Sequence, residues 1–304
     1  MSKLFKRYLR IVIGNEKTHD GIEIEKLRCH FEVTRDLLGF PNLATVRIYN
    51  LTRANREFIN IVQKRNLNAL GNDESNEGRL AIYAGYEESN GLIFKGDIMN
   101  IIHLREGVDM VTEILAKDGA REFQNGFSNF IVSENTKLID VLLRLQRDWP
   151  TIAKSEIRIS SGDKKLFSKT ICEPTKDVLN KLGRDYGFHW SFQNHKYTII
   201  DYDTVLNARA IVINNRTGMI DSPIVTEKGV DVKSLLNWEI KPYALIKVES
   251  QTEAVQLGNL YYRSINKTLG EGEFKVMRVV HTGDNYDNAW ESMITGYKRN
   301  AETV

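Results

Sequence analysis

The chain has 304 residues, of which 41% are hydrophobic and 27% charged, a balance that supports two globular domains or three small ones. The formal net charge of only +2 argues against a strongly electrostatic nucleic-acid-binding protein, a local basic patch aside.

The two cysteines, Cys29 and Cys172, suggest neither a disulfide framework nor a zinc site. The sequence has no run of about 18 apolar residues and no signal-peptide pattern, so we expect no membrane span and no secretion signal.

A candidate first strand covers residues 8–13, and extended structure resumes at 22–25 after a turn at 19–21. The most informative stretch follows, over residues 27–60. Cys29, Phe31 and Val33 alternate with polar residues at the period of a strand, which predicts that the Cys29 thiol is buried. Residues 39–42 (Gly-Phe-Pro-Asn) then break the chain, because glycine permits positive φ and proline lacks a backbone donor.

A second strand follows this break and completes a hairpin. Ala44, Val46 and Ile48 share one face of it, and the strand stops at residues 50–52. Thr52 is a suitable N-cap for a short helix whose apolar stripe begins at Phe58. The stretch therefore predicts a β-hairpin that leads into a helix.

Residues 66–78 form a polar loop, and a meander of strands follows it. The predicted strands cover 79–86, 92–100 with a continuation at 101–104, and 109–116, with turns at 88–91 and 105–107. Residues 1–122 are therefore predicted to be a mainly β domain. We expect a small barrel, because closure of a sheet removes its unpaired edges.

The pattern changes after Phe123, where an α/β insertion over residues 123–205 is predicted. A helix is expected over 133–146, capped by Asn135 or Thr136, and residues 151–170 are expected to be short and irregular. A second helix begins at Pro174 and ends at Gly187, which suits the residue that follows a helix. Strands at 188–192 and 197–201 then form a hairpin.

Residues 206–304 return to β structure and are predicted to form a second barrel. The expected strands are 211–213, 229–237, 244–250, 274–281 and 290–297, with turns at 214–218 and 282–285 and a polar excursion over 251–272. Two hairpins look alike. One begins with FKGDIMNIIH and ends at His103, and the other begins with FKVMRVVH and ends at His281. This weak repeat favours two related domains that flank the insertion, with strand exchange between them left open.

The sequence contains no phosphate-binding loop, no nucleophile elbow and no zinc-protease motif. His281 and Asp284 form a possible metal or acid–base pair, but a hairpin turn explains them better. His189 and His195 have no cysteine or carboxylate cluster beside them in the sequence. We therefore predict no catalytic residue, no metal ligand, no cofactor-binding residue and no cofactor.

Two charged groups also have simpler explanations. Paired carboxylates at Glu87 and Glu88 are a candidate for hydrolysis, but they lie beside Ser-Asn-Gly, which favours a solvated turn. The basic residues near the start are either phosphate contacts or the guarding charges of an edge strand, and we favour the edge strand. These residues are Lys3, Lys6, Arg7 and Arg10.

Three segments carry a resemblance: PNLATVRIYNL, PTKDVLNKLGRDYGFHWSFQNHKYTIID, and the series GVDVKSLLNWEIKP, IKVES and FKVMRVVHTGD. In this order they resemble the central baseplate hub proteins of phage T4 and of Mu-like and P2-like phages. The chain departs from these relatives at Lys241-Pro242, where they often have a Pro-Gly-type turn.

The resemblance implies two tube-type β-barrels around an α/β insertion, and a structural, non-enzymatic role in the virion after assembly in the host cytoplasm. It also implies a homotrimer that forms a pseudo-hexameric ring and joins the tail tube to the spike, with DNA passing through unread. The implied partners are tube or tube-initiator proteins, the central spike, baseplate wedge proteins and the tape measure protein. Two alternatives stay open: a tail-associated peptidoglycan hydrolase, and a carbohydrate- or peptide-binding β module.

Overall fold

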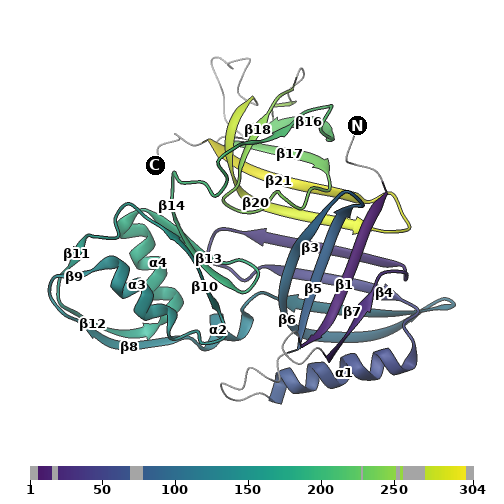
Figure 1. Cartoon of the computed structure of the whole chain (residues 1–304), viewed down its shortest axis with the longest axis horizontal. Coiled ribbons are helices and arrows are strands. Elements are labelled where there is room, and N and C mark those ends of the chain that lie inside the picture. Colours follow the sequence, from purple (N-terminus) through teal and green to yellow (C-terminus); the bar gives the residue numbers. More distant parts are fainter. Residues whose placement is uncertain are drawn as a thin grey trace.

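The computed structural model describes residues 6–15, 20–68, 78–226, 229–250, 254–255 and 271–298 (Figure 1). The N-terminal part is built from seven strands and one helix: β1 (Arg7–Asn15), β2 (Asp20–Ile24), β3 (Cys29–Asp36), β4 (Leu43–Tyr49), α1 (Arg53–Asn68), β5 (Arg79–Tyr86), β6 (Ser89–Glu106) and β7 (Asp109–Lys117). The predicted excursion over 251–272 lies mostly outside the described residues, as does most of the predicted loop over 66–78.

The middle part contains three helices and seven strands. They are α2 (Ala120–Asn125), β8 (Phe127–Val132), β9 (Thr136–Lys137), α3 (Leu138–Gln146), β10 (Ala153–Arg158), β11 (Lys165–Leu166), β12 (Lys169–Pro174), α4 (Thr175–Tyr186), β13 (Phe188–Phe192) and β14 (Lys196–Asp201). It lies to the left of the other strands in Figure 1. Among the described residues, no helix is long and apolar enough to cross a membrane.

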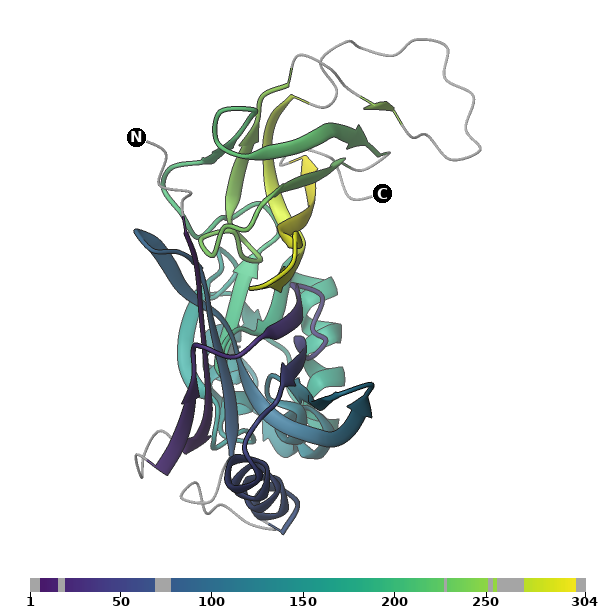
Figure 2. The same ribbon diagram turned by 90° about the vertical axis from the view of Figure 1, so that its right-hand side faces the viewer.

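The C-terminal part is again made of strands, which stack above the N-terminal strands in Figure 2. They are β15 (Ile211–Ile213), β16 (Met219–Val225), β17 (Gly229–Leu235), β18 (Leu245–Val248), β19 (Ala254–Val255), β20 (Gly272–Asp284) and β21 (Trp290–Lys298). The mainly β character of the fold therefore agrees with the sequence prediction, and helices α2, α3 and α4 all lie in the middle part.

One 14-stranded sheet runs through the N-terminal and C-terminal parts, in the order β19-β16-β17-β21-β20-β3-β4-β7-β6-β5-β1-β2, with β18 on β20 and β15 on β18. The two parts meet where β20 pairs antiparallel with β3, from Arg278 opposite Asp36 to Asp284 opposite His30. The path of the described strands is open, with β2 and β19 at its ends. Closed barrels and the three-domain division therefore stay predictions.

The hairpin of β3 and β4 forms as its alternation predicts. Phe31 pairs with Val46, and both side chains are buried in the N-terminal core, as is Cys29. Thr52 caps α1, because its hydroxyl oxygen accepts the backbone N–H of Asn55 at 3.2 Å. Gly283 lies across this core on β20, where a Cβ atom would come within 2.5 Å of the Phe31 ring. The glycine therefore serves close packing inside a strand.

The structure corrects the predicted start of the first insertion helix. Asn135 has positive φ, Thr136 belongs to a short strand, and α3 begins only at Leu138. The backbone N–H groups of Leu138 and Ile139 donate to the carbonyls of Lys164 and Gly162 at 2.9 and 3.0 Å. Neither Asn135 nor Thr136 is the N-cap, because distant backbone carbonyls satisfy the first helical donors instead. The second helix agrees with prediction, with Pro174 before it and Gly187 in the left-handed region after it.

Other corrections concern strands. The region 151–170, predicted to be irregular, contains β10 and β11, and β10 pairs in parallel with β14. Strand β16 and the six-residue helix α2 were not predicted. The last predicted turn, at 282–285, lies too early, because β20 continues through Asp284. β1 is not an edge strand as we expected, since it lies between β2 and β5.

Candidate functional site

The tip of the β13–β14 hairpin inserts polar groups against the N-terminal strands. The side-chain oxygen of Gln193 accepts hydrogen bonds from Nη2 and Nε of Arg35 at 2.9 and 3.2 Å. Its amide nitrogen donates to the backbone carbonyl of Asp36 at 2.8 Å. Asn42 adds a second link, because its amide donates to the Phe192 carbonyl at 2.8 Å. We call Arg35, Asn42 and Gln193 the junction network.

Arg35 is a charged residue in the buried register of a strand. It follows Cys29, Phe31 and Val33 at the same period of two, and only 2% of it is exposed. Burial lowers the pKa of its guanidinium to about 10, and the charge of Asp118 opposes that shift. Nη1 of Arg35 donates to the Ile93 carbonyl at 3.3 Å. The guanidinium is therefore held by acceptors from two separate parts of the chain.

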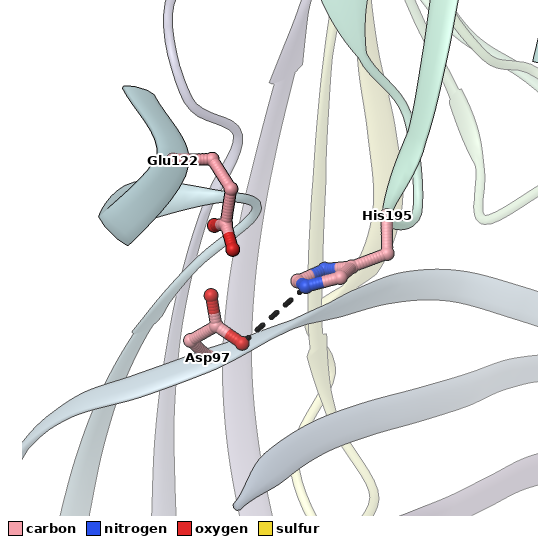
Figure 3. Close-up of side chains that lie close together, drawn as sticks. All are labelled: Asp97, Glu122 and His195. Atoms are coloured by element: carbon pink, nitrogen blue, oxygen red, sulfur yellow. Dashed lines mark ion pairs between the residues drawn. The ribbon is translucent and has the colours of Figure 1, made fainter. Parts of the chain in front are cut away.

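Beside the junction network lies a second group of polar side chains, formed by Asp97, Glu122 and His195 (Figure 3). Asp97 comes from β6, Glu122 from α2, and His195 from the turn between β13 and β14. Nε2 of His195 lies 3.4 Å from Oδ1 of Asp97. On the other side of the ring, Nδ1 lies 3.2 Å from Oδ1 of Asp118, which also accepts the backbone N–H of His195 at 2.8 Å. The ring thus lies between two carboxylates.

The electrostatics of this group favour positive charge. Burial lowers the pKa of His195, but the hydrogen bond to Asp118 and the charges of Asp97 and Asp118 raise it, and the net pKa lies above the ordinary value. Arg79 is the neighbouring cation, with Nε 3.6 Å from Oδ1 of Asp97. Three carboxylates from different elements therefore surround one imidazole in a buried position.

The insertion is also fixed to the C-terminal part. Ser191 and Tyr243 share a hydrogen bond of 2.9 Å between their hydroxyl groups. The buried Nζ of Lys275 donates to the carbonyls of Asp201 and Tyr202 at 2.9 and 2.8 Å. Strands β13 and β14 therefore contact both halves of the large sheet.

The two histidines of the weak repeat occupy similar positions. Nδ1 of His103 lies 3.0 Å from the Thr112 hydroxyl, and Nδ1 of His281 lies 2.8 Å from the Ser292 hydroxyl. In both cases the partner lies directly opposite on the paired strand. The possible pairing of His281 with Asp284 is not formed, because Asp284 instead binds Arg28 at 3.1 Å. The resemblance between the two hairpins thus extends to their side-chain contacts.

The other charged candidates bind protein groups. Glu87 pairs with Lys6 at 3.0 Å on the surface, and Arg10 pairs with Glu23 at 2.7 Å. Arg7 donates to the Asp284 carbonyl at 2.8 Å. Lys3 lies outside the described residues. These contacts favour a structural role for the basic residues over phosphate binding.

A surface depression of about 620 Å³ lies between α4, β13 and the β3–β4 turn. His189 lines it, with its ring 4.4 Å from that of Tyr202, and burial lowers its pKa to about 3. Two of the lining charges, Glu173 and Lys181, form an ion pair with each other. His189 is therefore neutral there, and the charges of Glu173 and Lys181 satisfy each other.

Sequence reasoning missed the junction network and the carboxylates around His195. The signal for Arg35 was present, since a charged residue continues an apolar alternation. No such signal exists for Asp97, Asp118 and Glu122, because their proximity to His195 depends on how the insertion folds back onto β6 and β7.

Solved structures of phage tail proteins share this fold. The 43 kDa tail protein of prophage MuSo2 from Shewanella oneidensis has a TM-score of 0.62 at 9% identity, with 96% of this chain and 97% of that chain covered. A tail protein from Neisseria meningitidis MC58 has a TM-score of 0.61 at 9% identity, with 97% of each chain covered. The E. coli c3393 protein, a component of the type VI secretion system, has a TM-score of 0.54 at 11% identity, with 89% and 73% covered. The chain therefore shares its fold with two phage-type tail proteins and with a secretion-system component.

The particular family follows from the sequence. The profile of the family described as Baseplate hub gp41 matches residues 9–258, so the chain belongs to that family of phage baseplate hub proteins. A search of curated protein sequences gives no match. The chain is therefore a structural component of the tail baseplate. The three sequence segments that resemble hub proteins, taken in their order along the chain, had predicted this.

Proposed function

We propose that this chain is the central hub subunit of a contractile tail, and that three copies form a ring between the tail tube and the spike. Membership of the baseplate hub family carries this proposal. In the ring, DNA passes through the lumen without being read. The tube or tube-initiator proteins, the spike, the wedge proteins and the tape measure protein are its neighbours, and the ring assembles in the host cytoplasm before it joins the virion.

The two similar hairpins support the proposed ring. β6 with β7 and β20 with β21 are long antiparallel pairs, and each places a histidine opposite a hydroxyl residue. Three chains that each carry two related units present six similar faces, which suits a six-fold tube on one side and a three-fold spike on the other. The E. coli c3393 protein is described as similar to the phage T4 tail proteins gp27 and gp5, which supports a shared architecture.

The tip of the β6–β7 hairpin is a candidate contact between copies. Leu104 is 41% exposed and Val108 is 93% exposed, and Ile102 is exposed as well. Exposed apolar side chains gathered on a projecting hairpin are typical of an interaction surface. We infer that this tip packs against the neighbouring subunit in the ring.

The mass of the purified protein in solution, alone and with its spike, tests the ring. Light scattering is expected to give about 105 kDa, three times the chain mass of 34.9 kDa. Leu104→Asp is expected to shift the protein toward the monomer, whereas Leu143→Asp, at an exposed apolar position on α3, is the matched control. A wild-type monomer both alone and with the spike would contradict the trimeric ring.

The hydrolase alternative gains no support from the site. Glu122 and His195 are 6% and 4% exposed, so a polysaccharide cannot reach them, and the exposed Glu87 is paired with Lys6. Clearing of peptidoglycan in a zymogram by the purified protein, but not by a heat-inactivated sample, would revive that alternative.

A further inference from the structure

Glu122 has an unused carboxylate oxygen in a buried position. Its Oε1 accepts a hydrogen bond from the Thr151 hydroxyl. Its Oε2 has no hydrogen-bond partner among the described residues. Figure 3 shows this carboxylate directed toward Asp97 and His195. Burying an anionic oxygen without a partner is costly, so the arrangement fits a positively charged ligand at this point.

The distance between Asp97 and His195 suits two ligands of one metal ion. A charge-assisted N–H···O bond is typically about 2.7–2.9 Å, and Nε2 lies 3.4 Å from Oδ1 of Asp97. Two ligands in a tetrahedral zinc site, each about 2.0–2.1 Å from the metal, lie about 3.3 Å apart. The three donor atoms from Asp97, Glu122 and His195 lie within 4.8 Å of one another. A modest movement of the Glu122 side chain would bring its carboxylate to the same ligand spacing as the other two.

Asp118 lies where a metal-bound histidine needs support, and a small rotation of the ring would align Nδ1, which has no hydrogen-bond partner among the described residues. Histidine ligands usually donate their other ring N–H to a carboxylate, which fixes the tautomer. Nδ1 of His195 lies 3.2 Å from Oδ1 of Asp118, and the backbone N–H of His195 donates to the same oxygen. With the proton on Nδ1, the lone pair of Nε2 faces Asp97 and Glu122. Thr151 holds Glu122 in a comparable way.

We propose that Asp97, Glu122 and His195 bind a divalent cation of the Zn²⁺ or Mn²⁺ class, through one carboxylate oxygen each and Nε2, with water completing the coordination. Imidazole together with carboxylates suits these ions better than Ca²⁺ or Mg²⁺, which prefer oxygen ligands alone. The bound ion would join β6, α2 and the β13–β14 turn, and so clamp the insertion onto the N-terminal strands.

Calorimetric titration of the full chain tests the site. The protein carries no affinity tag, is first treated with EDTA, and bears Cys172→Ser, because an exposed free thiol such as that of Cys172 can bind Zn²⁺ on its own. We expect one equivalent of Zn²⁺ or Mn²⁺ per chain and at least tenfold weaker binding in Glu122→Gln and His195→Gln. Glu87→Gln is the matched control, with wild-type affinity. Four-coordinate Co²⁺ absorption in place of Zn²⁺ is a second signature.

Two outcomes would overturn the proposal. The first is the absence of saturable one-site binding of either ion to the Cys172→Ser protein, which needs no further variant to interpret. The second is unchanged affinity in a folded Glu122→Gln protein, which would place the bound ion elsewhere. In either case the cluster is an internal ion network in which the imidazole alone bridges Asp97 and Asp118.

Discussion

Replacing Gln193 by leucine should release the insertion from the N-terminal strands. Leucine keeps the approximate volume but cannot accept the two Arg35 hydrogen bonds of 2.9 and 3.2 Å. The guanidinium then keeps the Ile93 carbonyl at 3.3 Å, in a position that is 2% exposed. A hydrogen bond from a charged group contributes about 1.5–3 kcal/mol, and the lost bond to the Asp36 carbonyl adds about 1 kcal/mol. Because both Arg35 bonds end on the same Gln193 oxygen, we count them as one charged interaction and expect a loss of about 2.5–4 kcal/mol in the free energy of unfolding.

Denaturation in urea, followed by tryptophan fluorescence, measures this loss. Trp149 and Trp190 report on the insertion core, while Trp290 lies in the N-terminal core, so the signal covers both sides of the junction. Gln124→Leu is the matched control, because Gln124 is exposed and should change stability by less than about 0.5 kcal/mol. A Gln193→Leu protein that stays within about 1 kcal/mol of this control would refute the coupling of Arg35 to the hairpin tip.

Two further predictions concern the N-cap of helix α1 and a buried histidine in the large sheet. Thr52→Ala removes the N-cap of α1 and should lower the free energy of unfolding by about 1 kcal/mol, measured by thermal unfolding followed by circular dichroism. Thr52→Ser keeps the hydroxyl and should cost much less. Equal losses in the two variants would contradict the cap. Burial lowers the pKa of His281 to about 3 from 6.5, so the unfolded chain takes up this proton first and stability falls as the pH falls from about 6.5 toward 3. The slope from this residue is about 1.4 kcal/mol per pH unit, and His281→Gln should remove it; an unchanged pH dependence would contradict the burial of a neutral ring.

The regular hairpins were predictable because local pattern and final structure agree in them. Cys29, Phe31 and Val33 alternate in the sequence and are buried in the structure. Strand β16 was not predictable in the same way. It contains Pro223 and a residue of positive φ, Asp221, and its register with β17 shifts between Ile220 and Ile224. A bulged strand of this kind loses its period of two, so the alternation that identifies strands is absent.

The predicted start of α3 was wrong for a different reason. Asn135 and Thr136 are residue types that cap helices, but the first helical donors find their acceptors at Gly162 and Lys164. That choice depends on a turn more than twenty residues away. The cluster around His195 could not be predicted for the same reason. Asp97 lies on β6 and reaches His195 only after the insertion has folded back onto the N-terminal strands. Local sequence rules do not carry this information.

The polar contacts of the insertion argue that it moves with the large sheet as one body. Gln193 binds Arg35 in the N-terminal part, and Lys275 of the C-terminal part donates to the carbonyl of Asp201. Apolar surfaces can slide over one another at little cost, but buried hydrogen-bonded groups lose their partners after a shift of about 1 Å. A hinge between the insertion and either half would therefore separate Arg35 from its Gln193 acceptor, or the buried Lys275 ammonium from the Asp201 and Tyr202 carbonyls. We expect the three predicted domains to act mechanically as a single unit, which suits the rigid hub that we propose for a contractile tail.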